Sequence, residues 1–505
     1  MKTSAAHQGQ PKAQHKGLIL ALLTVAMFMV VIDFSIIQIA LPTIKTQFNV
    51  PLSQLQWIVT GYSITYAGFL MLSGRTGDIY GRKKLFISGL VLFSLSSLAG
   101  GLAPSLTLLI AARIIQGVGA AIGSATGLSI VMATFPEGPE RNKVLSIFSA
   151  VLSSGFAAGV VLGGYMTADL GWRSVLLVNV PIGIVAAILS VKYLPESTSN
   201  SPNKHLDIPG AALLTSALIM LVYALIGAQN VGFTSFQTLS LIALSVIILL
   251  AFYFVEKRAR APLVDFSFMG RNTILGSNAL ALILSATVGG LIFVQTIYIQ
   301  QILNYPPATA GLLFLPQAFI FLVTSGWLSS RLVNRFGAKT VITSGMIVSA
   351  IGFIVLTQLS ISGGYLYGLL PGMILTSVGA GTAWTAISIM ALEGANKGEE
   401  GLASGLFNTS IQIGGPLGLA ILLTLAATRA QAVSSTLSAS AALVSGFQYA
   451  FIFAAVLACI AVVISIFTKS NGKQADIKAQ GEIEVPASPP TVSEGLITTV
   501  DDEQG

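Results

Sequence analysis

A carboxylate and a guanidinium lie in stretches of this sequence that are otherwise apolar, and such a pair can do proton chemistry. Asp33 lies within the apolar run 17–41 and is the only acidic residue deep within any run of this length. Arg113 lies within a second run, 105–133. A mid-membrane carboxylate costs about 2.5–3.5 kcal/mol on insertion scales, so Asp33 is expected to face protein or a water-filled cavity. Because burial favours the neutral form of a carboxylate and a nearby cation favours its charged form, a carboxylate under both influences can bind and release a proton.

The depths of these two residues permit them to pair. Asp33 lies eight residues before Leu41, near the end of its run, and Arg113 lies eight residues after Ser105, near the start of the other. If both runs are helices that cross one layer in opposite directions, a rise of ~1.5 Å per residue places both side chains about 12 Å below the same surface. A proton-transferring pair and a fixed structural ion pair both agree with this position.

The composition is that of a membrane protein. The chain is 54% hydrophobic and 9% charged, with a mean hydropathy of +0.82, whereas soluble domains carry about 25% charged residues. A helix needs about 20 apolar residues to cross a hydrocarbon core of ~30 Å. Fourteen segments reach this length: 17–41, 54–74, 85–103, 105–133, 143–168, 173–193, 207–228, 236–255, 272–302, 308–330, 339–360, 364–391, 402–428 and 446–468. The sequence therefore predicts an all-α polytopic membrane protein with fourteen transmembrane helices.

The positions of the basic residues predict how these segments are oriented. Cytoplasmic loops carry an excess of Lys and Arg. With the N-terminus inside, 22 of the 26 basic residues fall at cytoplasmic loops or ends, three (Lys45, Arg173 and Arg429) fall outside, and Arg113 lies in a span. We therefore expect both termini inside and a multi-pass protein of the cell membrane, a bacterial inner or plasma membrane.

A thirteen-residue stretch occurs twice, which suggests an internal repeat. Residues 72–84 read LSGRTGDIYGRKK and residues 328–340, at an offset of 256, read LSSRLVNRFGAKT, with five identical positions. Such spacing is typical of transporters built from two related halves. The expected division is a polar arm (1–16), an N-terminal six-helix bundle (17–200), an inserted transmembrane hairpin with its loops (201–262), a C-terminal six-helix bundle (263–468) and a disordered cytoplasmic tail (469–505).

The first copy of this stretch also resembles a known family signature. Its residues Gly74, Asp78, Gly81, Arg82, Lys83 and Lys84 match the pattern G-x-x-x-D-x-x-G-R-K/R-K/R, which is similar to the loop between helices 2 and 3 of the major facilitator superfamily. One departure is Ile79, where that family usually has arginine. The resemblance implies that this loop acts as a conformational switch that locks the two bundles in one state.

The predicted arrangement, two six-helix bundles with an inserted hairpin, resembles the fourteen-helix drug:proton antiporter branch of that superfamily. Two further motifs match patterns of the family. The segment 32–42, with Asp33, Ala40, Leu41 and Pro42, is similar to the pattern L-D-x-T-I-V-N-V-A-L-P. The segment 113–121 matches the pattern R-x-x-Q-G-x-G-x-A, which the resemblance links to proton transfer through Arg113.

Glycines in the segment 143–168 predict close helix packing. Gly155, Gly159 and Gly163 share one helix face, and such faces let helices approach closely. Together with Gly164 they look like the antiporter signature G-x-x-x-G-P-x-x-G-G, except that Val160 replaces the proline, so that any kink there must come from the glycines.

Polar and aromatic residues within the spans are candidates for a substrate cavity. Tyr62 and Tyr66, at positions i and i+4, share one helix face. Each candidate could equally well form a hydrogen bond to a neighbouring helix instead of lining a cavity. The full set is Gln38, Tyr62, Tyr66, Gln116, Gln295, Tyr298, Trp384, Asn408 and Gln412.

Other chemistries find no support in the sequence. There is no P-loop and no plausible dinucleotide-binding fold, so we expect no enzyme activity and no cofactor, with the proton gradient as the driving force. The single cysteine, Cys459, and three histidines in polar segments make a metal site unexpected. The net charge of +7 follows membrane topology and indicates no nucleic-acid partner.

These observations favour a proton-coupled antiporter that exports amphipathic organic compounds, lipophilic or cationic, by alternating access. Its partners would be small substrates, protons and the lipid bilayer, and a monomer is the default that the resemblance implies. Two alternatives stay open at this point. One is proton-coupled uptake of a small solute on the same fold, and the other is a membrane sensor or scaffold that transports nothing.

Overall fold

The structure is a computed structural model of the 505-residue chain, and it describes residues 16–135, 139–196, 206–259, 262, 264, 266–396 and 399–469. The predicted arm, 1–16, and the predicted tail, 469–505, lie outside the described residues except for Lys16 and Lys469. Several basic residues of the topology argument, Lys204, Arg260 and Lys397 among them, also lie outside.

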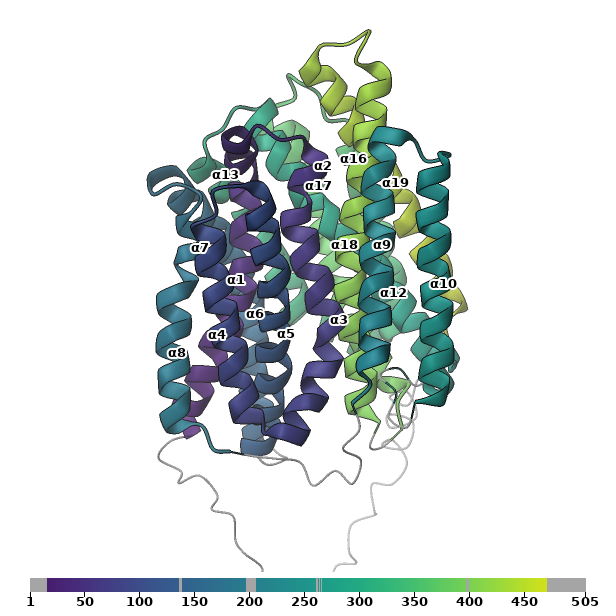
Figure 1. Ribbon diagram of the computed structural model, residues 1–505. Coiled ribbons are helices and arrows are strands. Elements are labelled where there is room, and N and C mark those ends of the chain that lie inside the picture. Colours follow the sequence, from purple (N-terminus) through teal and green to yellow (C-terminus); the bar gives the residue numbers. More distant parts are fainter. Residues whose placement is uncertain are drawn as a thin grey trace, which may run out of the picture. The chain divides into compact units, whose positions relative to one another are not determined.

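Within the described ranges every regular element is a helix (Figure 1). This follows from the apolar composition, because a chain in hydrocarbon must satisfy its backbone hydrogen bonds within each segment. The first part contains α1 (Lys16–Phe48), α2 (Leu52–Leu55), α3 (Trp57–Tyr80), α4 (Arg82–Gly101), α5 (Leu106–Thr134), α6 (Pro139–Asp169), α7 (Ser174–Leu177) and α8 (Asn179–Tyr193). A hairpin of α9 (Ile208–Val231) and α10 (Phe236–Arg258) follows.

The last part of the chain is more often interrupted. It contains α11 (Phe266–Met269), α12 (Asn272–Ile297) with its π-helical extension η2 (Tyr298–Ile302), α13 (Pro307–Leu313), α14 (Leu315–Val323), η3 (Thr324–Leu328), α15 (Ser329–Phe336), α16 (Ala338–Leu356), η4 (Gly364–Leu369), α17 (Leu370–Glu393), α18 (Glu400–Val433) and α19 (Ala439–Phe467). We refer to α1–α8 as the first half and to α12–α19 as the second half.

Twelve of the described helical segments are long and apolar enough to cross a membrane, and they match twelve of the fourteen predicted segments. The chain is therefore an all-helical, multi-pass membrane protein. The two remaining predicted segments correspond to α3, with 24 residues, and α6, with 31. The buried face of α3 carries Thr60, Ser63 and Thr65, which lower its average hydropathy.

The two halves use the same packing arrangement. In the first half α1 lies along α6 and α4 lies along α5; in the second half α12 lies along α18 and α16 lies along α17. The two copies of the repeated stretch also turn in the same way. Gly81 (φ +109°) separates α3 from α4, and Gly337 (φ +81°), 256 residues later, separates α15 from α16. Glycine adopts such positive φ angles readily because it has no Cβ.

The hairpin lies beside the halves. Helix α9 packs against α3 and α18, and α10 packs on the other side of α9 (Figure 1). Large apolar side chains of α10, such as Leu239, Ile247 and Phe254, are exposed. Exposed apolar side chains on a membrane-spanning helix are suited to contact with lipid.

Candidate functional site

The two charged residues singled out from the sequence form an ion pair. The Arg113 Nη1 atom, in α5, lies 2.5 Å from Asp33 Oδ2, in α1, and both side chains are 0% exposed. Burying two charges is costly, and it is tolerated only where geometry and additional hydrogen bonds compensate. The remaining partners of each group therefore decide what the pair can do.

The carboxylate of Asp33 accepts two further hydrogen bonds at its other oxygen. Gln116 Nε2, from α5, lies 2.8 Å from Asp33 Oδ1, and Asn179 Nδ2, from α8, lies 2.7 Å from it. Both amides also donate to the hydroxyl of Ser97, at 3.2 Å each, and this hydroxyl donates to the carbonyl of Leu176 at 2.9 Å. Asp33 is thus the centre of a polar network that joins α1, α4, α5 and α8.

The guanidinium of Arg113 is held from several sides. Its Nε donates to the carbonyl of Ile58 at 3.1 Å, and its Nη1 also donates to Gln116 Oε1 at 2.8 Å. Its carbon Cζ lies 4.2 Å from the ring centre of Tyr62, which is a cation–π distance. Its Nη2 has no hydrogen-bond partner among the described residues.

Local sequence explains why these groups meet. Ser105 caps α5 by accepting from the Leu108 N–H, which sets the start of the helix that carries Arg113. Gln116 lies three residues later on the same face. A side chain at Gly117 would overlap the backbone of Tyr62, so this glycine lets α3 and α5 approach closely enough for Arg113 to reach Ile58.

The predicted glycine face of α6 packs against the helix that carries Asp33. Gly155 lies against Val31 and Phe28, Gly159 against Ile32 and Ser35, and Gly163 against the carbonyl of Ile36. Gly164 lies instead against Pro307 and Ala308 of α13, in the second half. The glycines therefore fix α6 to α1 and bring one end of α6 to the other half of the chain.

Sequence reasoning missed the counterpart of this face in the second half. Gly414 and Gly418 of α18 pack against the carbonyls of Leu282 and Ala286 in α12. At the offset of 256, Gly159 corresponds to Gly415 and Val160 corresponds to Pro416, a proline inside α18. The offset aligns Gly155 and Gly163 with Ile411 and Leu419, so the repeat alone points to this helix but does not locate the face formed by Gly414 and Gly418.

Some of the predicted cavity residues come together beside the ion pair. The rings of Tyr62 and Tyr66 stack, with centroids 6.2 Å apart and an interplanar angle of 19°. The Tyr66 hydroxyl lies near the side chains of Ser124, in α5, and Gln412, in α18, although the Ser124 hydroxyl has no hydrogen-bond partner among the described residues. Tyr66 thus contacts the second half, and Tyr62 contacts Arg113.

The other predicted cavity residues do not join this group. Tyr298 donates to the carbonyl of Ser360 at 2.7 Å, and Asn408 donates to that of Ser404, four residues earlier, at 2.9 Å. The ring of Trp384 packs edge-on against Phe321. The two remaining amides differ: Gln38 donates weakly within its own helix, to Phe34, and Gln295 is fully buried without a hydrogen-bond partner among the described residues.

The predicted switch loop is bonded within the first half. Arg82 Nε and Nη2 lie 2.8 and 2.7 Å from Asp78 Oδ1, and Arg82 Nη1 donates to the carbonyl of Ser129, in α5, at 3.4 Å. Gly81 lies beside the carboxylate of Glu196. Of the other predicted loop residues, Gly74 faces Ala125 in α5 and Lys83 is partly buried in the first turn of α4.

Among the residues that the structure describes, the hydrogen bonds between the two halves lie at the opposite end of the helices, which we call the Lys45 end. Lys45 Nζ, in α1, donates to Gln301 Oε1, in η2, at 3.2 Å, and Gln300 Nε2 donates to the carbonyl of Ile39 at 2.9 Å. Lys45 and Gln301 are 256 residues apart, so they occupy equivalent positions of the repeat. Equivalent residues meet on the axis that relates two copies, and the halves are therefore joined there at the Lys45 end.

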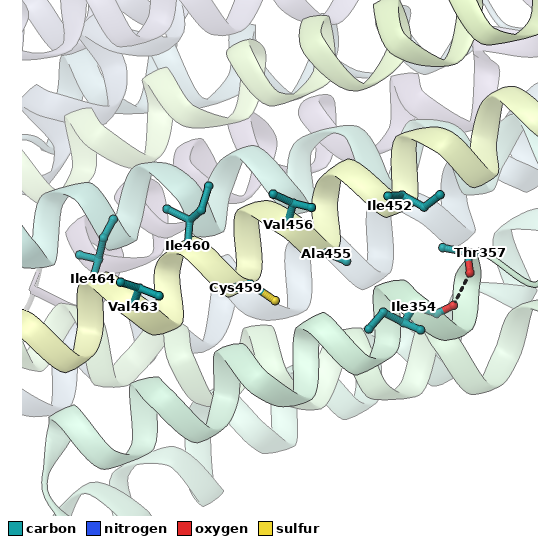
Figure 2. Close-up of a pocket in the computed structure, with 9 residues that line it drawn as sticks. All are labelled: Ile354, Thr357, Ile452, Ala455, Val456, Cys459, Ile460, Val463 and Ile464. Carbon is teal, nitrogen blue, oxygen red and sulfur yellow. Dashed lines mark hydrogen bonds between the residues drawn. The ribbon is translucent and has the colours of Figure 1, made fainter.

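A hollow of about 570 Å³ lies between α16 and α19 (Figure 2). Its lining is aliphatic apart from Cys459 and Thr357, and the Thr357 hydroxyl already donates to the carbonyl of Ile354. No polar group is left to orient a ligand. Among the described residues there is also no cluster of three or more His, Cys, Asp or Glu side chains that could hold a metal ion.

Fold and site together define a multi-pass helical membrane protein with a buried acid–base pair in its first half. Residues 23–419 match the family model of the Major Facilitator Superfamily, and the chain belongs to this family. It is a transport protein rather than an enzyme.

Similar proteins include several named for export or resistance. The cephamycin export protein of Amycolatopsis lactamdurans is 37% identical over 86% of this chain and 89% of its own. The puromycin resistance protein of Streptomyces alboniger is 33% identical over 96% and 97%. A multidrug resistance protein of Mycobacterium tuberculosis is 34% identical over 78% and 73%.

A solved structure shares the fold at low sequence identity. It is a bacterial homologue of the human lysosomal transporter Spinster, inward-facing and unoccupied, with a TM-score of 0.64 and 16% identity over 92% of this chain and 98% of that one.

Two residues of the polar network, Asn179 and Ser97, were not predicted as site residues. Asn179 stands in the segment Asn-Val-Pro-Ile-Gly (179–183), which resembles the antiporter branch, and this was the available signal. Ser97 lies in a stretch with several serines, and nothing in the sequence distinguishes it from its neighbours.

Proposed function

We propose that this protein is a proton-coupled antiporter that exports amphipathic, lipophilic or cationic organic compounds by alternating access. The observation that carries the proposal is the fully buried Asp33 carboxylate, paired with Arg113 and bonded to two amides. Protonation of this carboxylate would remove the negative charge that balances the Arg113 guanidinium, so the stability of the arrangement depends on whether a proton is bound.

Protonation of Asp33 is the proposed coupling step. Once neutral, the carboxyl no longer compensates Arg113, and an uncompensated buried charge costs about 3–5 kcal/mol. That free energy favours any rearrangement that gives the guanidinium a new partner or water. A conformational equilibrium can be shifted only by such a difference between its states.

The proposed cycle has three stages. With the cavity open to the cytoplasm, Asp33 is deprotonated and substrate enters. After the halves rock to the outward-facing state, a proton reaches Asp33 and substrate leaves. Return with the proton bound, followed by its release inside, completes the cycle.

The cycle requires the predicted topology. In the proposed topology α3 and α6 also cross the membrane, which gives fourteen spans with both termini inside the cell membrane. Their lengths of 24 and 31 residues exceed the ~20 needed, and each packs lengthwise against a candidate span. The six spans before and the six after the hairpin would then form the two moving bundles of a monomer.

The contacts between the halves support an assignment of conformation. Hydrogen bonds join them at the Lys45 end, which is extracellular in the proposed topology. At the other end Asp78 and Arg82 bond within the first half. With that topology, the state we propose for this structure is closed outside, and the switch loop would engage the second half only in the outward-facing state.

The relatives support export of organic compounds. Three of them are named for cephamycin export, puromycin resistance and multidrug resistance, and each is matched over more than 70% of both chains. Puromycin, a cephamycin, tetraphenylphosphonium and a neutral lipophilic dye are therefore suitable probes.

Transport into inside-out proteoliposomes tests this function. We expect uptake of at least one probe into vesicles with an acidic lumen and loss of that uptake when a protonophore collapses the gradient. The control is Cys459→Ser, which alters only the groove between α16 and α19 and should transport normally. Uptake that ignores the proton gradient would contradict proton coupling, and accumulation only with the gradient reversed would indicate import.

A further inference from the structure

Tyr62 lies between the ion pair and the second half of the chain. Its side chain is 3% exposed, and the Arg113 guanidinium lies over its ring at 4.2 Å. The nitrogens Nε and Nη1 of Arg113 are held by Ile58, Asp33 and Gln116, whereas Nη2 has no hydrogen-bond partner among the described residues. The Tyr62 ring thus adds a cation–π contact to a guanidinium that does not use all of its hydrogen-bond donors.

The same ring is connected to α18. Tyr62 stacks on Tyr66 at 6.2 Å, and the Tyr66 hydroxyl lies near Gln412, which lies in the second half. The series Asp33, Arg113, Tyr62, Tyr66, Gln412 is therefore continuous from the proposed proton site to the helix that must move against it. The first three steps are an ion pair, a cation–π contact and a ring stack, and the last is the proximity of the Tyr66 hydroxyl to the Gln412 side chain, where α3 packs against α18.

The hydroxyl of Tyr62 takes no part in this series. It is buried and has no hydrogen-bond partner among the described residues. Buried polar groups are normally hydrogen-bonded, so an unpartnered hydroxyl on a ring with two specific neighbours indicates that the ring itself is the functional part.

We propose that Tyr62 is a positioning residue that couples the position of α18 to the Asp33–Arg113 pair. The inference rests on the proposed antiport function. While α18 is in the present position, Gln412 and Tyr66 hold the Tyr62 ring under the guanidinium, and the guanidinium stays on Asp33. When α18 moves, or when a substrate separates Tyr66 from Gln412, the ring shifts and Arg113 is freed from the carboxylate, which can then take up a proton.

A substrate-binding role for Tyr62 makes a different prediction from a positioning role. A residue that contacts substrate changes KM when its ring is removed. A residue that positions Arg113 changes the maximal rate and the number of protons moved per substrate, with little effect on KM.

Three variants separate these roles in reconstituted vesicles. Tyr62→Phe keeps the ring and should match wild type in maximal rate, KM and proton stoichiometry. Tyr62→Leu should lower the maximal rate by about tenfold, as expected for loss of a buried cation–π contact, with KM within about twofold. Gln412→Ala leaves the ring in place and removes its connection to α18. Both Gln412→Ala and Tyr62→Leu should therefore lower the number of protons moved per substrate.

The control is Tyr223→Leu, which removes a tyrosine from α9 on the hairpin and should behave as wild type. A Tyr62→Leu variant with wild-type rate and stoichiometry would overturn the inference, as would a change confined to KM or a Tyr62→Phe variant as impaired as Tyr62→Leu. If Tyr62→Leu does not fold, a Gln412→Ala variant with wild-type stoichiometry would overturn it. A wild-type protein that transports without protons would instead refute the antiport function, and this inference with it.

Discussion

The two halves of the molecule share a scaffold but differ in buried charge. Both pack their first and fifth long helices through glycines, and both turn at a glycine with positive φ. At the offset of 256, however, Asp33 corresponds to Gly289, which packs against the backbone of Gly415. Arg113 corresponds to Leu369, which is fully buried. The second half therefore fills with backbone and leucine the positions where the first half holds an ion pair.

This difference indicates a division of roles between the halves. A buried ion pair is costly and must be held by neighbours, and the first half supplies them through Gln116, Asn179 and Ser97. The second half has an ion pair among its described residues too, Arg271 with Glu399, but both side chains are about a third exposed. The first half thus holds the buried ion pair that we propose as the coupling site, and the described second half has no buried counterpart of it at the equivalent positions.

The largest effect is expected from replacing Arg113 by leucine, the residue type at the equivalent position of the second half. Arg113→Leu leaves Asp33 buried without its cation and should destabilise the protein by about 3–5 kcal/mol. Adding Asp33→Asn removes the stranded charge and should restore much of that loss, which a double-mutant cycle of thermal unfolding in detergent measures. A double variant that is less stable than Arg113→Leu alone would contradict the account of the pair.

Alanine at the packing glycines should destabilise both halves. A Cβ at Gly163 would strike the carbonyl of Ile36, and one at Gly418 would strike that of Ala286. Each substitution should cost about 1–3 kcal/mol by overpacking. Gly123→Ala in α5, where nothing lies within 4 Å, is the control and should be neutral or stabilising. The loss should be larger at Gly418, where the added Cβ would lie closer to the carbonyl oxygen than the 2.7 Å at Gly163. A loss at only one of the two positions would show that the glycine packing is not shared.

The two turn glycines allow a finer comparison. Alanine at Gly81 or Gly337 would have to adopt positive φ, at about 1–2 kcal/mol each. Gly81→Ala should be the more damaging of the two, because Glu196 lies beside Gly81 whereas nothing lies within 4 Å of Gly337. Combining Gly81→Ala with Glu196→Ala should remove the additional loss of thermal stability that Gly81→Ala shows relative to Gly337→Ala. An additional loss that persists in this double variant would show that the backbone conformation at Gly81, and not Glu196, causes it.

The smallest effect is expected at the exposed ion pair. The hydrogen bond from Arg271, together with the Asn396 backbone N–H, lowers the pKa of Glu399 below its ordinary value of 4.5. A lowered pKa means that the contribution of Glu399 to stability is present above this ordinary value and is lost as the pH falls through the lowered one. The melting temperatures of wild type and Glu399→Gln should therefore differ slightly at neutral pH and converge in acid. A difference that grows in acid would have the wrong sign.

Much of the fold was predictable because its signals are local. Long apolar segments, the alternation of basic loops and the two copies of one loop are all visible in the sequence. The meeting of Asp33 and Arg113 was suggested by their equal depth. Asn179 was harder to place, because its contact with Asp33 depends on how α8 is rotated against α1, and periodicity does not specify rotation.

The cavity residues show the same limit more clearly. Tyr62, Tyr66 and Gln412 converge because α3 and α18 lie side by side. Asn408, on the same helix as Gln412 and four residues away, bonds its own backbone instead. Residue type gave equal reason to choose either, and only the packing of the helices separates them.

Substrate-induced proton release from inside-out membrane vesicles tests the central claim most directly. We would add probes to vesicles with an acidified lumen and compare wild type with Asp33→Asn. The account predicts that a transported probe makes the wild-type lumen more alkaline and that the asparagine variant gives no such change. Proton release that persists at full strength in Asp33→Asn would contradict the assignment of Asp33 as the coupling site.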